Sequence, residues 1–204
     1  HGTALRFGSM TELIGALSGL GLASSAGLNA YIPALLTAVL ARYTDLVTLP
    51  KEFEFLGSGW VLITLAVLLV IEEVVDKIPG ADHLNDVVQT VVRPVSGAVL
   101  FAAGSEDAFG RHTWLALGVG FVAALGVHAT KAAGRGVVNV STGGIGAPVV
   151  SVIEDIVSLT GAVVAIVAPV LVILFVIAFV WLLVVILRKR RERRDRRAAA
   201  AVPT

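Results

Sequence analysis

The amino-acid sequence predicts an all-α fold: a polytopic transmembrane helix bundle of five or six spans with interrupted helices, either broken or re-entrant. Apolar residues fill 56% of the 204 positions, and charged residues fill only 15%. The mean hydropathy is +0.89. Uncharged runs at 13–41 and 156–187 are longer than the ~20 residues that one span needs. A soluble domain carries about 25% charged residues and cannot bury this much apolar surface in one small core. Because cysteine is absent, disulfides, thiolate metal ligands and cysteine nucleophiles are excluded.

The first uncharged run predicts two helical pieces. Residues 1–9 lack the pattern of a signal peptide, so we expect translation to start at Met10 and treat 1–9 as a non-native leader. The middle of the run, SSAGLNAYIP, is small and polar. We expect a break near Gly27–Asn29 and a second piece that starts close to Pro33. A single long kinked helix is the alternative.

Further apolar runs predict the remaining spans, at Trp60–Ile71, Leu84–Ala103, Trp114–Val127 and Ala147–Ser158. Residues 134–148, GRGVVNVSTGGIGAP, are too polar to face lipid and too apolar for a solvated linker. This composition predicts non-helical backbone that lies against protein or a wet cavity. The last run, 156–187, contains Pro169 and forms either one long kinked helix or two tightly joined helices.

The chain ends in a strongly basic tail, residues 188–204. Positions 188–197 read RKRRERRDRR, a net charge of +6 that leaves −5 on the rest of the chain. The positive-inside rule predicts this tail on the cytoplasmic face of the membrane, with residues 10–187 as the transmembrane domain. Nucleic acid is not expected as a partner, since no aromatic residue interleaves the run. Anionic lipid headgroups are expected to contact Arg188, Lys189, Arg190 and Arg191.

Ionisable residues gather after the Trp60–Ile71 run. On a helix, Glu72 and Asp76 share a face, and Glu73 pairs with Lys77 at i,i+4. These residues predict charge at or near membrane depth, where an ionisable side chain costs ~3 kcal/mol or more unless it is paired.

A second group of ionisable residues follows Pro79-Gly80. Asp82 is placed to cap a helix on which Asp86 follows one turn later. His83 lies between them, so the three side chains are a weak candidate for an O/N metal site. No paired histidine spacing supports a metal, and we expect no cofactor.

Arg93 lies in an otherwise uncharged stretch, about two turns beyond Asp86. We therefore expect it to meet an acid, with Glu72, Glu73 and Glu154 as candidates. The pair either locks helices together or belongs to a polar pathway inside the bundle; the third alternative is a lone interfacial charge that snorkels to water.

Two weaker patterns complete the analysis. Gly15 and Gly19 are four residues apart, which favours close helix packing within the chain or a seam between two copies. A shift of 54 positions suggests an internal repeat, in which a Lys, a glycine turn, an Asn and a helix-starting Pro recur. It aligns Lys77 with Lys131, Gly80 with Gly134, Asn85 with Asn139 and Pro94 with Pro148.

Three segments carry a resemblance to a known family. They read GLASSAGLNAYIPALL, WVLITLAVLLVIEEVVDKIPGADHLNDVVQTVVRPVSGAVL and HATKAAGRGVVNVSTGGIGAPVVSVIED. Together they resemble the bacterial membrane family catalogued as domain of unknown function 4126, over roughly Met10 to Leu187. The resemblance implies a multi-span membrane protein. It carries over no activity, substrate or catalytic residue.

The leading functional hypothesis is a small transporter or channel-like permease, and not an enzyme. Helix breaks and fixed cations favour an anionic or phosphate-bearing solute or lipid headgroup, whereas the acids would suit protons or a cation. The alternatives are a scaffold or lipid-binding protein, and a metal-dependent enzyme that acts on lipid headgroups. Expected site residues are Asn29, Glu72, Glu73, Asp76, Lys77, Asp82, Asp86, Arg93, Lys131 and Asn139.

Overall fold

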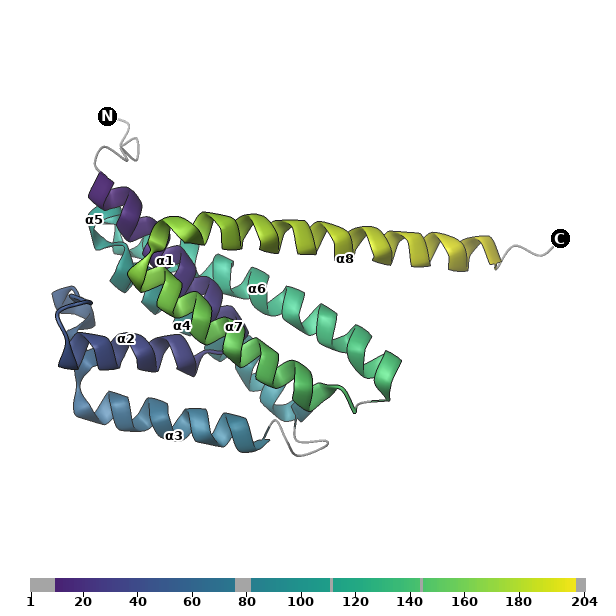
Figure 1. The fold of residues 1–204 in the computed structure, drawn as a ribbon, viewed down its shortest axis with the longest axis horizontal. Coiled ribbons are helices and arrows are strands. Elements are labelled where there is room, and N and C mark those ends of the chain that lie inside the picture. The colour runs from purple at the N-terminus through teal and green to yellow at the C-terminus, as the bar shows by residue number, and fades with distance from the viewer. Residues whose placement is uncertain (1–9, 76–81, 111, 144, 201–204) are drawn as a thin grey trace.

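A computed structural model describes residues 10–75, 82–110, 112–143 and 145–200, and these form helices without any strand. The predicted all-α bundle is confirmed (Figure 1). The leader predicted at 1–9 lies outside the described residues. The elements are α1 (Met10–Leu28), α2 (Tyr31–Tyr43), η1 (Lys51–Gly57), α3 (Gly59–Val75), α4 (Asp82–Gly104), α5 (Glu106–Phe109), α6 (Thr113–Thr142), α7 (Ala147–Val167), η2 (Pro169–Leu171) and α8 (Val172–Ala200).

Among the described residues, four helices are long and apolar enough to cross a membrane. They are α4, α6, α7 and α8, and the pair η1–α3, bent by 59°, makes a fifth span if it is counted as one. The chain is therefore a helical membrane protein at the lower end of the predicted number of spans. The first two helices, α1 and α2, account for the difference from the six spans that the sequence allowed.

Helices α1 and α2 form a hairpin rather than a span. The chain breaks at Asn29–Ala30, close to the predicted position, and Pro33 lies in the first turn of α2. Ala26 and Ala34 then pack in one apolar cluster, one on each side of the break. Figure 1 shows α1 running inward from the end of the bundle that carries Met10, and α2 running back toward that end.

The two ends of the bundle are defined by this hairpin. The N-terminal end carries the start of α1, the end of α2 and α5, whereas the C-terminal end carries the ends of α3 and α6 and the start of α7 (Figure 1). The tip of the hairpin lies between the two ends, in the middle of the bundle. The backbone of the break is therefore buried in protein, which is the setting in which non-helical backbone is tolerated at membrane depth.

Small residues let α1 pack closely on its neighbours. A Cβ at Gly15 would lie 3.2 Å from Gly104 O, and one at Gly19 would lie 2.8 Å from Phe101 O. Gly27 similarly faces Val127 of α6. Of the two interpretations of the Gly15 and Gly19 pair, the structure uses close packing within the chain.

Helix α6 corrects one prediction. Non-helical backbone was expected at 134–148, but α6 continues to Thr142 and α7 starts at Ala147. The hydroxyls of Ser141 and Thr142 donate to Val138 O, so the helix satisfies its own polar side chains. Gly143, at a φ of 61°, then ends the helix in the left-handed region that favours glycine.

The predicted internal repeat is also wrong. Gly134 and Asn139 lie inside α6 instead of in a turn, and Pro94 lies within α4 instead of near its start. Lys77 and Gly80, the start of the first copy, lie outside the described residues. The four identities therefore do not mark equivalent structures.

The last uncharged run forms two helices, which was one of the two predicted alternatives. Helix α7 ends at Val167, and η2 starts at Pro169, whose ring disfavours helical backbone at the preceding Ala168. Helix α8 then runs toward the C-terminal end and leaves the bundle (Figure 1). It remains helical through the basic run to Ala200, where Arg188, Lys189 and Arg191 are exposed.

Candidate functional site

Asn29 holds the break between α1 and α2. Its side-chain oxygen accepts hydrogen bonds from Tyr31 N at 3.0 Å and Ile32 N at 3.1 Å, in the manner of a helix N-cap. Its amide nitrogen donates to Asp155 Oδ1 of α7 at 2.8 Å. The carboxylate thus lies near the positive end of the α2 dipole, which stabilises negative charge there.

Lys131 of α6 satisfies the other side of the break. Its Nζ donates to Leu28 O at 2.7 Å, which is one of the carbonyls that the end of α1 leaves without an intrahelical partner. The same nitrogen lies 2.9 Å from Glu154 Oε2 of α7. The Lys131 and Glu154 side chains are only 3% and 12% exposed, so this is a buried ion pair at a helix break.

Arg93 and Glu72 form a second buried ion pair. Arg93 Nη2 donates to Glu72 Oε1 at 2.9 Å, and the side chains are 1% and 2% exposed. This confirms the expectation that Arg93 meets an acid and selects Glu72 among the three candidates. Because a guanidinium only donates, His128 Nδ1 accepts from Arg93 Nη1 at 3.3 Å. A neutral His128 then donates from Nε2 to Thr90 Oγ1, at 3.2 Å.

These groups form one layer in the middle of the bundle. Its formal positive charges are Arg93, Lys131 and Arg135, and its formal negative charges are Glu72, Glu154 and Asp155, so the layer is neutral with His128 uncharged. We call these seven residues and Asn29 the buried polar layer. Such a layer is expensive at membrane depth unless its charges are paired, as two of its acids are here.

A hollow of about 440 Å³ opens between α6, α7 and α8 on the C-terminal side of the layer. Apolar side chains such as Val127, Val157 and Phe179 make most of its wall. Lys131, Arg135 and Glu154 supply its charges. This C-terminal hollow is within the range of volumes that small-molecule sites occupy.

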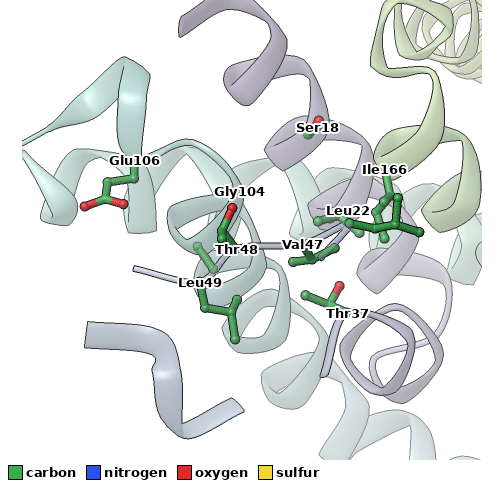
Figure 2. A pocket seen from close by; sticks show the side chains of 11 residues that line it. Ser18, Leu22, Thr37, Val47, Thr48, Leu49, Gly104, Glu106 and Ile166 are labelled. Atoms are coloured by element: carbon green, nitrogen blue, oxygen red, sulfur yellow. The ribbon is translucent and has the colours of Figure 1, made fainter. Parts of the chain in front are cut away.

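A second hollow, of about 270 Å³, lies on the N-terminal side (Figure 2). Its wall includes Leu22 of α1, Thr37 of α2 and Gly104 of α4. Figure 2 shows the Thr37 hydroxyl directed toward Val47, while the Glu106 carboxylate lies apart at the edge. In the described part of the chain, the buried Thr37 Oγ1 has no hydrogen-bond partner. We call this the N-terminal hollow.

Helix α1 lines both hollows. Leu22 lines one and Leu28 the other, and six helical residues span ~9 Å along α1. Between them lie Ser25 and Ala26, which pack against Gly161 and Ala162 of α7. Ser25 Oγ is buried and, within the described residues, has no hydrogen-bond partner. The arrangement is a polar layer with a hollow on each side.

Comparison with known proteins places the chain in a family. The family profile described as "Domain of unknown function (DUF4126)" matches residues 16–189. The chain belongs to the DUF4126 family. Nothing among the curated proteins or the solved structures compared with it matches the chain. The match covers α1 through the hydrophobic part of α8, and therefore the whole buried polar layer of this DUF4126 protein.

The structure brings four of the predicted site residues together in the layer, namely Asn29, Glu72, Arg93 and Lys131. Glu73 is half-buried beside Glu72. Asp76 and Lys77 lie outside the described residues. Asn139 lies in α6, and Asp82, His83 and Asp86 lie in α4, but the structure does not describe the side chains of these four residues. Among the described residues, no group of three His, Asp or Glu side chains could hold a metal ion.

Sequence reasoning left four members of the layer out of the expected site, namely His128, Arg135, Glu154 and Asp155. His128, Lys131 and Arg135 are spaced three and four residues apart, which places them on one face of a helix. That spacing was a usable signal once α6 was known to be continuous. Asp155 gave no such signal, because its partner Asn29 is 126 residues away.

Proposed function

We propose that this DUF4126 protein is a small permease that carries an anion with an apolar body across the membrane. The substrate class is a phosphate, sulfate or carboxylate group attached to a short apolar chain. The observation that carries the proposal is the buried Lys131, which lines the C-terminal hollow at the point where α1 is broken. A broken helix near the middle of a membrane protein is a common design of solute sites.

The charges of the C-terminal hollow support an anion. Two cations, Lys131 and Arg135, line it against one acid, Glu154. An ammonium has three N–H donors, and Leu28 O and Glu154 engage two of those of Lys131. The apolar wall lowers the local dielectric, so a cation there attracts an anion more strongly than it would in water. The same wall favours a solute with an apolar part.

The second hollow supports passage instead of binding alone. A permease needs access to one site from both sides, and here the residues of α1 that line the two hollows, Leu22 and Leu28, are ~9 Å apart along the helix. The buried hydroxyls of Ser25 and Thr37 lie along this route. A buried hydroxyl without a partner costs about 1–3 kcal/mol, a cost that a passing solute or water removes.

The proposed orientation places the C-terminal end in the cytoplasm of a bacterial cell. The basic run after Leu187 is the strongest concentration of Lys and Arg in the chain and lies at that end. Positive charge of this kind is retained on the cytoplasmic side. In this position Arg188, Lys189, Arg190 and Arg191 face the anionic headgroups of the inner leaflet. The N-terminal hollow then opens to the outside.

A scaffold that only packs helices is the second candidate. The two buried ion pairs favour it, because paired charges can serve as locks between helices. In that case the hollows hold lipid chains and nothing crosses.

Uptake of a defined probe separates the two candidates. The protein is reconstituted into phosphatidylethanolamine–phosphatidylglycerol liposomes and given radiolabelled hexyl sulfate, a permanent monoanion with an apolar chain. We expect saturable uptake above that of protein-free liposomes, and little uptake of inorganic sulfate, which lacks the chain. A short-chain fluorescent phosphatidic acid, followed between leaflets, tests a lipid source of the same anionic chemistry. Absence of transport for both amphipathic probes would overturn the permease.

A further inference from the structure

We propose that a proton binds together with the anion and that Glu154 carries it. This inference rests on the proposed function and names the coupling ion of the same site. The observation behind it is the position of the Glu154 carboxylate, which lines the C-terminal hollow and lies 2.9 Å from Lys131 Nζ. An anion that reaches Lys131 therefore shares this cation with a carboxylate.

The charge of the layer creates the need for a proton. Three acids balance three cations in the resting structure, so one added anion leaves a net charge of −1 or below. An unbalanced charge at membrane depth costs several kcal/mol. Two anionic groups that share one site in a low dielectric do not both stay ionised, and one of them takes up a proton. A sulfate monoester stays ionised, so the protein must supply the protonated group.

The surroundings of Glu154 are consistent with this role. From α6 it faces Lys131 and Arg135, and Arg93 of α4 acts on it from further away. On its own helix the next residue is Asp155, an acid that adds to the repulsion. The Leu28 end of α1 lines the same hollow as Glu154. Helix α8 contributes apolar side chains to this wall and no described charge. The one charged residue of α2, Arg42, lies in the last turn of that helix, and the hydroxyl of Tyr31 accepts a hydrogen bond from Gln89 of α4.

The other two acids are held away from the hollow. Glu72 pairs with Arg93, and its side chain is 2% exposed. Asp155 accepts from the Asn29 amide at the start of α2. Neither lines the C-terminal hollow. Glu154 is therefore the acid of the layer that an incoming anion approaches first.

The step is a simple transfer. A proton from water binds one carboxylate oxygen of Glu154, the ion pair with Lys131 opens, and the anion takes its place on the ammonium. No other covalent bond changes. A monoanion and one proton then move together without net charge, so a pH gradient alone can drive accumulation.

Proton uptake on binding tests the inference directly. Hexyl sulfate is added to the purified protein in weakly buffered detergent solution, and an indicator dye reports the protons taken up. Because hexyl sulfate itself does not titrate, any proton belongs to the protein. We expect about one proton per bound anion, and an affinity that falls about tenfold per pH unit at high pH. The wild-type protein alone is enough to show whether a proton binds with the anion.

A neutral side chain at the same position locates the proton. The Glu154→Gln variant should bind hexyl sulfate with no proton uptake and with an affinity independent of pH. The exposed Glu52→Gln variant is the matched control and should behave as the wild type. Binding without proton uptake in the wild type would overturn the inference and leave the permease standing. Unchanged proton uptake in Glu154→Gln would assign the proton elsewhere. No binding at all would instead count against the proposed function.

Discussion

Replacing Arg93 with methionine is expected to lower the free energy of unfolding by about 3–5 kcal/mol. The substitution removes the partner of Glu72 and leaves a carboxylate whose side chain is 2% exposed without its counter-charge. It also removes the donor to His128 Nδ1. The free energy is measured by unfolding in mixed detergent micelles with increasing dodecyl sulfate.

Two further variants identify the cause of this loss. Arg42→Met is the control, because exposed Arg42 donates a hydrogen bond to Gly57 O and lies over the Tyr43 ring among the described residues, and loss of these exposed contacts should cost about 1 kcal/mol or less. The double variant Arg93→Met, Glu72→Leu removes both charges and should recover most of the stability, since paired apolar residues often replace a buried ion pair without cost. If Arg93→Met costs no more than Arg42→Met, the pair does not hold α4 against α3.

Replacing Lys131 with methionine is expected to weaken the binding of hexyl sulfate about 10–100-fold. The substitution removes a buried ammonium that the proposal assigns to the anion, and a hydrogen bond to a charged group contributes about 1.5–3 kcal/mol. Uptake into liposomes should fall with binding. Equilibrium dialysis with labelled hexyl sulfate gives the Kd.

The binding measurement must distinguish loss of the anion site from loss of the folded protein. Lys131→Met leaves Glu154 without its cation, so the double variant Lys131→Met, Glu154→Gln is measured beside it. This variant should fold as the wild type does and still bind hexyl sulfate about 10–100-fold more weakly. Lys51→Met, on the exposed surface of η1, is the matched control and should bind normally. Normal binding by the folded double variant would contradict the role of Lys131.

Part of this arrangement follows from local sequence. The break at Asn29 is predictable because a small polar stretch before Pro33 favours a helix start, and the side chain of Asn29 caps that start. The pairing of Arg93 is predictable because an unpaired guanidinium is too costly inside a membrane. Glu72 was among the candidates, and it is the partner.

The rest depends on contacts between distant segments. Residues 134–142 have the composition of a loop, yet a helix satisfies their backbone groups internally, and this outweighs propensity in a membrane protein. The return of α2 toward the N-terminal end depends on partners of the break more than 100 residues away, Lys131 and Asp155. The hollows arise from this return and from the angle between α7 and α8, which no local pattern encodes.

Reactivity of single introduced cysteines tests the central claim most directly, that one buried layer is reached from both sides. The chain has no cysteine of its own, so each variant reports one position. With an impermeant thiol reagent applied to either face of oriented vesicles, Thr37→Cys should react from the side of the N-terminal hollow. Thr130→Cys should react from the other side, because it lines the C-terminal hollow.

The reactivity of Ser25→Cys, a position between the two hollows, distinguishes a permease from a fixed lock between helices. A permease that opens alternately to each side should expose it to reagent from both faces, and hexyl sulfate should slow the reaction. Ala124→Cys, equally buried but on α6 against Gly97 of α4 and Gly27 of α1, should not react and serves as the control. If Ser25→Cys is as unreactive as Ala124→Cys from both faces, the layer is a fixed lock between helices and the permease account is wrong.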